Sequence, residues 1–329
     1  MKEFFRKQWF LFVLLGFVLV GYLEPRPGKF LRDNVSIKWF IMPTIFLMSL
    51  SLRTGAIFRS FLNVRGLASA VVGGYAMTSL SLYVLARLFF PSHEDLALGL
   101  IAVGATPCTL ASAAIWTRLS GGNDALALAI TIMSNLTSFL FSPLILTVAL
   151  GSAISPPFGR IMAKLFLVIV LPVAVGQVLR IWMGAFADRW KPVIGNIARF
   201  LILLVVVVSV SHASHTAGVA GASGGMTGGC LLLLILTVAL AHLFAMAGCG
   251  LIARLTGAPP GDIVAVMFGG SQKTLPVGVF LSDMIADGRP DQALVFIALP
   301  ILIYHATQLT IDSFIIQPCR KRIMGEDGD

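Results

Sequence analysis

The stretch from Phe268 to Val279 places a lysine and a proline inside a long apolar segment, and it reads F-G-G-S-Q-K-T-L-P-V-G-V. A lysine at membrane depth costs about 2.5–3.5 kcal/mol on insertion scales, and a proline removes a backbone hydrogen bond from a helix. Such a sequence persists in a membrane segment only where it lines a cavity or is buried in protein. We therefore expect Lys273 and Pro276 to lie in an interrupted helix at a polar centre.

Composition indicates that the surrounding chain is an all-α polytopic membrane protein. Of 329 residues, 57% are hydrophobic and 12% are charged, whereas soluble domains carry roughly a quarter charged residues. The net charge of +9 is typical of lysine and arginine in cytoplasmic loops. No basic stripe with interleaved aromatic residues is present, so nucleic acid is not an expected partner.

Apolar runs predict ten transmembrane helices by the ~20-residue criterion. The expected spans are 8–23, 37–52, 65–90, 95–117, 123–150, 161–184, 193–215, 229–254, 261–284 and 291–317. Basic loop residues favour both termini in the cytoplasm. The first span lacks a small-residue cleavage site and predicts an uncleaved helix. The expected location is the inner (plasma) membrane, if the organism is bacterial.

Two matching stretches half a chain apart predict an internal repeat. At a constant offset of 165, the matched positions are Gly104, Thr106, Thr109 and Leu110 with Gly269, Ser271, Thr274 and Leu275. Each half then holds five helices, and an odd number inverts the second half relative to the first. Inverted repeats with interrupted helices at matching positions are typical of secondary transporters. We expect repeats at 1–155 and 156–329, with the fourth and ninth helices interrupted at Pro107 and Pro276.

The expected substrate or ion site combines both interruptions with the fifth helix. It comprises Thr106, Pro107, Thr109, Ser112, Thr131, Ser134, Asn135, Ser271, Gln272, Lys273, Thr274 and Pro276. The set is rich in hydroxyl and amide groups, contains one cation and has no obvious carboxylate. The depth of Asp312, late in the tenth helix, is left open by the pattern.

Three interpretations of Lys273 follow. The ammonium could pair with an anionic substrate, or it could stand where a coupling cation would sit and allow proton coupling. Alternatively, Lys273 braces the fourth helix by donating to carbonyls or hydroxyls there.

Three stretches carry a resemblance to a known family. They are T-P-C-T-L-A-S-A-A-I-W-T (Thr106–Thr117), G-G-N-D-A-L-A-L-A-I-T-I-M-S-N-L (Gly121–Leu136) and G-G-S-Q-K-T-L-P-V-G (Gly269–Gly278). The chain resembles the bile acid:sodium symporter family, and within it the divergent branch of the solute carrier family 10 member 7 type. The resemblance implies a panel domain of helices 1, 2, 6 and 7 and a core domain of helices 3–5 and 8–10. Helices four and nine would cross in the core.

The resemblance carries the sodium ligands over only in part. Ser112, Thr131, Asn135 and Gln272 fall at ligand positions and form a vestigial sodium site. Ala113 replaces the asparagine of the fourth-helix motif, Phe268 replaces the glutamate of the ninth, and Lys273 replaces the asparagine beside it. The acidic ligand common to both sodium sites is therefore missing.

The leading functional expectation is a secondary transporter that moves a small organic anion by alternating access without classical sodium coupling. The alternatives are a sodium-coupled bile-acid or organic-anion symporter and a non-transporting membrane regulator of calcium entry. The motifs G-x-S-x-G and H-E-x-x-H and paired midplane aspartates are absent, so an enzyme is not expected. No cofactor is expected other than Na⁺ or H⁺ as a coupling ion, and the solute and oligomeric state are left open.

Overall fold

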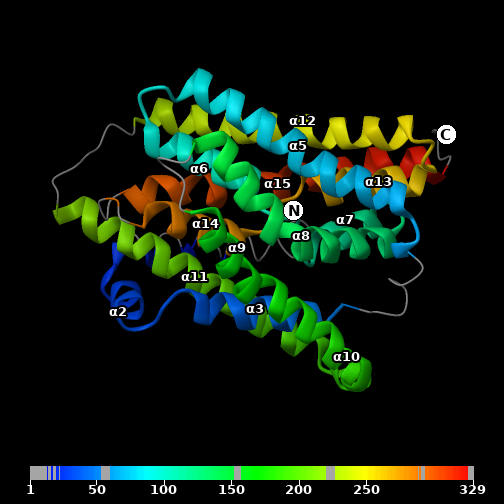
Figure 1. The fold of residues 1–329 in the computed structure, drawn as a ribbon, viewed down its shortest axis with the longest axis horizontal. Coiled ribbons are helices and arrows are strands. Elements are labelled where there is room, and N and C mark those ends of the chain that lie inside the picture. The colour runs from blue at the N-terminus through cyan, green and yellow to red at the C-terminus, as the bar shows by residue number, and fades with distance from the viewer. Residues whose placement is uncertain are drawn as a thin grey trace.

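The computed structural model describes residues 13, 16–17, 20–21, 23–52, 60–151, 157–219, 227–287, 289 and 293–324. Within these residues every regular element is a helix and no strand occurs (Figure 1). The all-α prediction is confirmed over this part of the chain.

The helices fall on either side of a connection at residues 151–157. Before it lie α2 (Arg26–Asn34), α3 (Lys38–Leu50), α5 (Val64–Phe89), α6 (Glu94–Ala105), α7 (Ser112–Leu119) and α8 (Asp124–Leu150). After it lie α9 (Phe158–Leu165), the π-helical turn η1 (Phe166–Val170), α10 (Leu171–Arg189), α11 (Lys191–Val219), α12 (Gly228–Leu255), α13 (Pro260–Ser271), α14 (Leu275–Ala286) and α15 (Ala293–Met324).

Seven segments of the described chain are long and apolar enough to cross a membrane. They correspond to predicted helices three and five to ten. The second predicted helix appears as the 13-residue α3, and the fourth is divided into α6 and α7. The predicted first helix, 8–23, and the boundary between the predicted repeats at 155 lie largely outside the described residues. Among the seven, Pro260–Ala286 is the most enclosed, with 89% of its apolar window buried.

Several boundaries differ from the prediction. The sixth span extends from Phe158 to Arg189 and the tenth reaches Met324. The short basic helix α2 was not predicted. It begins after Pro25, and its Gly28 packs so closely on α11 that a Cβ there would lie 2.4 Å from the Cβ of Ser211.

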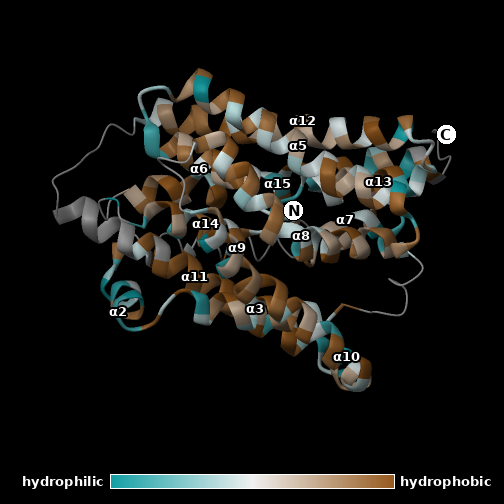
Figure 2. Ribbon diagram, in the orientation of Figure 1, coloured by the Kyte–Doolittle hydropathy of each residue, from teal (hydrophilic) through white to brown (hydrophobic). Residues whose placement is uncertain are grey.

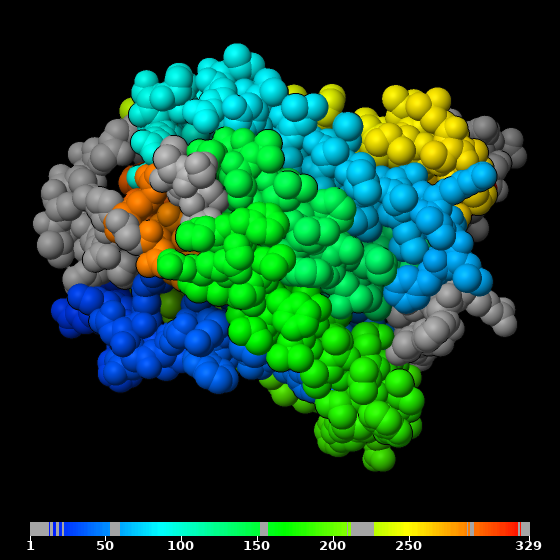
Figure 3. All heavy atoms as spheres, in the orientation of Figure 1, coloured from blue at the N-terminus to red at the C-terminus, as the bar shows by residue number. Residues whose placement is uncertain are grey.

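The helices pack in two groups. In one, α11 packs against α2 and α3, and α10 packs against α3; in the other, α5–α8 and α12–α15 enclose one another (Figure 1). Figure 3 shows α10 standing out from the body of the molecule. An ion pair of 2.8 Å between Arg32 on α2 and Asp283 on α14 connects the groups.

Hydrophobic residues predominate along the helices of both groups (Figure 2). Large exposed apolar side chains include Val148, Trp182, Leu232 and Phe244. Exposed apolar side chains on several helices are what a lipid environment favours, and they agree with the transmembrane interpretation.

Small residues and caps position the inner helices around α13. A Cβ on Gly74 of α5 would lie 2.5 Å from the carbonyl oxygen of Gly270, so only glycine allows this approach. Asn63 and Asn123 cap the N-termini of α5 and α8, and their amides both donate to the Asp262 carboxylate at 2.7 and 2.8 Å. Asp262 thereby joins the ends of three helices.

Candidate functional site

The first interruption separates α6 from α7. Helix α6 ends at Ala105 because the residue before a proline is disfavoured in the helical region, and Thr106 is extended with ψ 139°. Regular helix resumes at Ser112. The unwound backbone between them is buried from Thr106 to Leu110, so its polar groups need partners within the protein.

The second interruption separates α13 from α14. Gln272 and Thr274 are both extended, with ψ 143° and 126°. Pro276 lies in the first turn of α14, where a missing N–H costs nothing because that group has no helical partner. Both interruptions therefore occur where the sequence predicted them, and the proline accounts for each.

The two breaks meet directly. The backbone N–H of Thr274 donates to the carbonyl oxygen of Pro107 at 3.0 Å. Segments 167 residues apart in sequence thus share a main-chain hydrogen bond at the centre of the second packing group.

Helix α8 satisfies the first break. The N–H of Cys108 donates to Ser134 Oγ at 2.9 Å, and its carbonyl accepts from Asn135 Nδ2 at 2.8 Å. Ser142 Oγ donates to the carbonyl of Ala105 at 2.6 Å. Two of the predicted site residues, Ser134 and Asn135, therefore hold the unwound chain in place.

Helix α15 does the same for the second break. The N–H of Lys273 donates to Gln308 Oε1 at 2.8 Å, and its carbonyl accepts from Gln308 Nε2 at 2.9 Å. The Tyr304 hydroxyl donates to the Ser271 carbonyl at 2.8 Å. Cys108 and Lys273 lie 165 residues apart. In each, side chains of one neighbouring helix bond both the backbone N–H and the C=O: α8 does so for Cys108 and α15 for Lys273.

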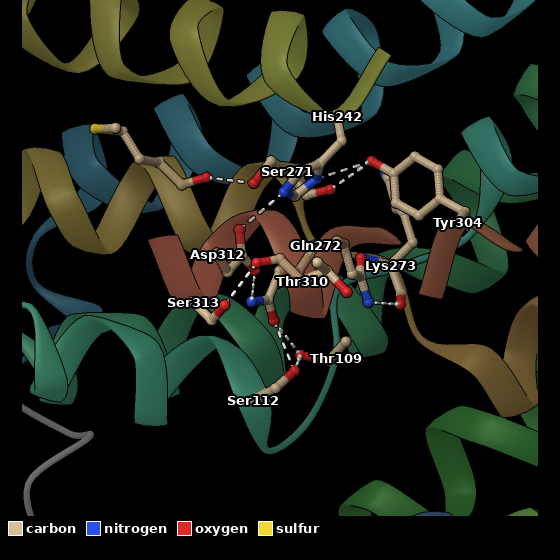
Figure 4. Close-up of polar contacts among 12 residues, drawn as sticks. Thr109, Ser112, His242, Ser271, Gln272, Lys273, Tyr304, Thr310, Asp312 and Ser313 are labelled. Atoms are coloured by element: carbon tan, nitrogen blue, oxygen red, sulfur yellow. Dashed lines mark hydrogen bonds and ion pairs between the residues drawn. The ribbon is translucent and has the colours of Figure 1, made fainter. Parts of the chain in front are cut away.

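Gln272 links the polar side chains of the two breaks (Figure 4). Its Oε1 accepts from the hydroxyls of Thr109 at 2.9 Å and Ser112 at 2.7 Å. Its Nε2 donates to Asp312 Oδ2 at 2.5 Å. Ser112 is half-buried while Gln272 is fully buried, so the network reaches toward the surface at the start of α7.

Asp312 corrects the expectation that the centre has no carboxylate. It is 0% exposed, midway along α15, and its second oxygen accepts from His242 Nε2 of α12 at 2.8 Å. His242 is equally buried, and its other nitrogen, Nδ1, lies 3.3 Å from the Tyr304 hydroxyl. The sequence analysis did not identify His242 as a site residue.

Lys273 is the buried cation of the site. It is 2% exposed, and its Nζ lies 5.0 Å from the centroid of the Tyr75 ring. Within the described residues its ammonium makes neither an ion pair nor a hydrogen bond. The interpretation that Lys273 braces the fourth helix through carbonyls or hydroxyls therefore finds no support in these contacts. The Tyr75 hydroxyl itself donates to the carbonyl of Ser134 at 3.2 Å.

Three other predicted site hydroxyls are used locally. Those of Thr106, Thr131 and Ser271 donate to carbonyls of their own helices at 2.8–2.9 Å. Such hydroxyls still have free acceptor lone pairs, but they do not join the Gln272 network. Pro107, Thr274 and Pro276 contribute backbone geometry.

Two enclosed, interrupted helices crossing inside an apolar helical shell define a multi-pass integral membrane protein with a polar centre, the arrangement that transport proteins use. Residues 8–321 match the SBF-like CPA transporter family, and the chain belongs to this family.

Curated relatives agree with this membership. The chain is 26% identical to sodium/bile acid cotransporter 7-B of Xenopus laevis over 326 residues, which cover 95% of the chain and 92% of the relative. It is 26% identical to sodium/bile acid cotransporter 7 of Rattus norvegicus over 318 residues, covering 94% and 92%. It is 29% identical to the probable chloroplastic sodium/metabolite cotransporter BASS4 of Oryza sativa subsp. indica over 338 residues, covering 97% and 77%. The protein is a membrane transporter by family.

Proposed function

We propose that the protein is a secondary transporter that moves a small organic anion, and that the crossing of the two interrupted helices is its binding site. The observation that carries the proposal is the Lys273 ammonium, which is buried beside the Tyr75 ring and has no anionic partner at contact distance in the described chain. A buried charge is costly unless it is paired, and a bound anion supplies the pair.

The backbone at the crossing favours the same ligand. Helices α7 and α14 both begin there, at Ser112 and Leu275, and helix N-termini carry partial positive charge. The half-buried Ser112 offers a route from the surface, and the hydroxyl and amide groups around Gln272 suit a polar organic solute.

We further propose ten transmembrane helices in two inverted repeats, residues 1–155 and 156–329. The equal lengths of α6 and α13, 12 residues each, support this arrangement. The matching backbone environments of Cys108 and Lys273 also support it. The panel would consist of helices 1, 2, 6 and 7, and the core of helices 3–5 and 8–10.

Alternating access would result from relative motion of the panel and the core. The core would rock or slide against the panel and expose the crossing first to one side and then to the other. The Arg32–Asp283 ion pair lies between α2, on the panel side, and α14 of the core. It is a contact that such a motion must break.

Sodium coupling in the family's manner is not part of the proposal. Of the four vestigial ligand positions, Gln272 Oε1 accepts from both Thr109 and Ser112, and Thr131 donates to its own helix. The Asn135 side-chain oxygen alone is buried without a partner. A single free side-chain oxygen among these four positions does not form the cage of hard oxygen ligands that such a cation needs.

Phe268, at the position of the family's glutamate, packs instead in an apolar cluster with Met246 and Val264. This position of α13 therefore carries no acidic group and has apolar neighbours.

Asp312 favours one alternative, a sodium-coupled organic-anion symporter. Its carboxylate lies against Gln272 and could supply the charge that Phe268 lacks. The names of the relatives include sodium. Strong stimulation of solute exchange by sodium over potassium would select this alternative.

Counterflow in proteoliposomes tests the proposal. Liposomes loaded with a single unlabelled solute and diluted into the labelled solute accumulate label only if a carrier exchanges it. A panel of mono- and dicarboxylates, sulfonates and phosphate esters, each beside an uncharged analogue, is compared with empty liposomes in sodium and potassium buffers. We expect exchange of at least one anion in both buffers. No exchange by any solute, or preference for uncharged analogues, would contradict the proposal.

A further inference from the structure

His242 lies at the end of a buried polar chain that the anion site does not use. Its Nε2 is 2.8 Å from Asp312 Oδ1, and its Nδ1 is 3.3 Å from the Tyr304 hydroxyl. The two rings meet edge to face, with centroids 5.7 Å apart. Both ring nitrogens therefore have a partner, although α12 is otherwise apolar at this depth.

With Asp312 ionised, counting the hydrogens of these side chains gives two arrangements. The carboxylate accepts at both oxygens, so His242 Nε2 donates to it. Tyr304 has one hydroxyl hydrogen, and at 2.8 Å it donates to the carbonyl of Ser271. A bond from His242 Nδ1 to the tyrosine oxygen then requires a second proton on the imidazole. When His242 is neutral, its Nδ1 carries no hydrogen. The Tyr304 hydroxyl must then donate to Nδ1 and give up its hydrogen bond to the Ser271 carbonyl.

We infer that His242, held against Asp312, is the site of a coupling proton that travels with the anion. The inference rests on the proposed function above. Adding the proton converts the buried pair from neutral imidazole and carboxylate to imidazolium and carboxylate. It also fixes the Tyr304 hydrogen on Ser271, the last residue of α13.

Two connections carry this change to the crossing. The first runs from His242 through Tyr304 to the Ser271 carbonyl, next to the break in α13. The second runs from Asp312 through the side chain of Gln272 to Thr109 and Ser112. Both ends of the chain therefore contact the segment that carries Lys273.

The charges of the site explain why proton and anion bind together. With neutral His242, Lys273 and Asp312 carry +1 and −1 without contacting each other, so the net charge of the site is zero. A monoanion bound at Lys273 then gives the ammonium a contact partner but leaves the site with a net charge of −1. With a proton on His242 the site carries one positive charge, and a monoanion restores the balance. Because an uncompensated buried charge is costly, each ligand strengthens binding of the other. The predicted exchange is one proton per monovalent anion, without net charge movement.

The helices packed against α12 carry the other titratable groups of the site, of which Asp312 and Tyr304 contact His242. The break after α13 contributes Lys273, α5 contributes Tyr75, and α15 contributes Asp312, Tyr304 and His305. Cys249 lies on α12 itself, and Cys108 of the first break is close enough to interact electrostatically with Lys273 and Asp312. Of these, Asp312 alone makes an ion pair with His242.

Solid-state NMR of the protein with ¹⁵N-labelled histidine in lipid bilayers tests proton binding without any solute. The chain has five histidines, and His242→Gln identifies the signal of His242. We expect this signal to change from the neutral Nε2–H form to imidazolium as the sample is acidified over a range of about pH 8 to pH 5. Asp312→Asn should lower the midpoint by more than about one pH unit, a tenfold loss of proton affinity.

Two further variants keep this test decisive. Tyr304→Phe keeps the ring but removes the acceptor for Nδ1–H, so it should also lower the midpoint of the His242 signal. It provides the test if Asp312→Asn does not fold. His93→Gln, at the N-terminal end of α6, should leave it unchanged. The inference is overturned if His242 stays neutral throughout the range, or if it titrates identically in wild type, Asp312→Asn and Tyr304→Phe.

Exchange under a pH gradient tests the coupling. With any anion found by counterflow, an inward proton gradient should drive accumulation in wild type but only equilibration in His242→Gln. Titration of His242 without gradient-driven accumulation would overturn the coupling. If anions exchange but His242 does not titrate, the proton site is overturned and the proposed function stands. If His242 titrates but no anion exchanges, the proposed function is contradicted instead.

Discussion

The backbone N–H of Thr274 donates a hydrogen bond of 3.0 Å to the carbonyl oxygen of Pro107. This bond joins the unwound segments of two helices at the most enclosed part of the molecule. On either side of it, side chains of α8 and α15 bond the backbone N–H and C=O groups of Cys108 and Lys273. The crossing is therefore a fixed scaffold, and the Lys273 ammonium, which makes no ion pair or hydrogen bond within the described residues, is the group free to recognise a ligand.

Exchanging the acid and the amide between Gln272 and Asp312 should reveal their coupling. Gln272→Glu alone places two carboxylates in contact, and Asp312→Asn alone removes the acceptor that Gln272 and His242 share. Each single variant should lower the thermal unfolding midpoint. The double variant restores an acid–amide pair, so its loss of stability should be smaller than the sum of the two single losses by about 0.5–3 kcal/mol. Simple addition of the two losses would contradict the direct contact.

The Tyr75 ring should contribute to solute affinity through Lys273. Tyr75→Phe keeps an aromatic face 5.0 Å from the ammonium, so it should bind an exchanged anion nearly as wild type does. Tyr75→Leu removes the face that orients Lys273. A cation–π contact of about 0.5–2 kcal/mol corresponds to roughly 2–30-fold in affinity. Ligand-induced shifts in thermal unfolding measure this difference, and equal affinities for Phe and Leu would show that the ring does not orient the lysine.

A methyl group on Gly74 should disturb the site by separating two helices. Its Cβ would meet the carbonyl oxygen and Cα of Gly270 at 2.5 and 2.8 Å, and a helix backbone cannot move aside alone. Gly74→Ala should therefore lower the unfolding midpoint and weaken solute exchange.

Gly184→Ala is the matched control, because nothing lies within 4 Å of its added Cβ. Alanine should stabilise α10 there by about 0.5–1 kcal/mol. If both variants change stability in the same direction, the close approach of α5 and α13 is wrong.

Crosslinking Arg32 to Asp283 should arrest transport. In a background of Cys230→Ser and Cys319→Ser, Arg32→Cys and Asp283→Cys are joined with a short bis-methanethiosulfonate, which forms a reducible disulfide with each thiol and releases methanesulfinate. Their parent side chains form an ion pair of 2.8 Å and are about a quarter exposed, so the thiols are within reach. Exchange should stop and return on reduction.

The control pair is Arg118→Cys with Asp124→Cys, which replaces a surface ion pair within one packing group. Crosslinking there should leave exchange unchanged. Unimpaired exchange across the linked Arg32 and Asp283 positions would contradict relative motion of α2 and α14.

Local rules explain which parts of the fold the sequence could predict. Both helix interruptions follow from proline, whose effect on the preceding residue and on backbone hydrogen bonding is confined to one turn. The apolar runs likewise mark spans by length alone. The short helix α2 was missed because its nine residues contain no apolar run.

The sequence could not predict that Asp312 belongs to the site, because its position depends on parts of the chain that are distant in sequence. The predicted tenth helix ended at 317, which put Asp312 near its end, whereas α15 extends to Met324 and leaves Asp312 mid-helix. His242 sits alone in the apolar run of α12, and its partner is 70 residues away. A single polar residue gives no periodic signal, so only packing could show the pair.

Counterflow by Lys273→Met beside wild type, with one anionic solute and its uncharged analogue, tests whether the Lys273 ammonium binds the anion. Methionine keeps most of the side-chain volume and removes the charge. If the Lys273 ammonium pairs with the anion, the variant should lose exchange of the anion at least tenfold, corresponding to about 1.4 kcal/mol. Its unfolding midpoint should be equal or higher, because the unpaired buried charge is gone. Undiminished anion exchange by Lys273→Met would contradict the account.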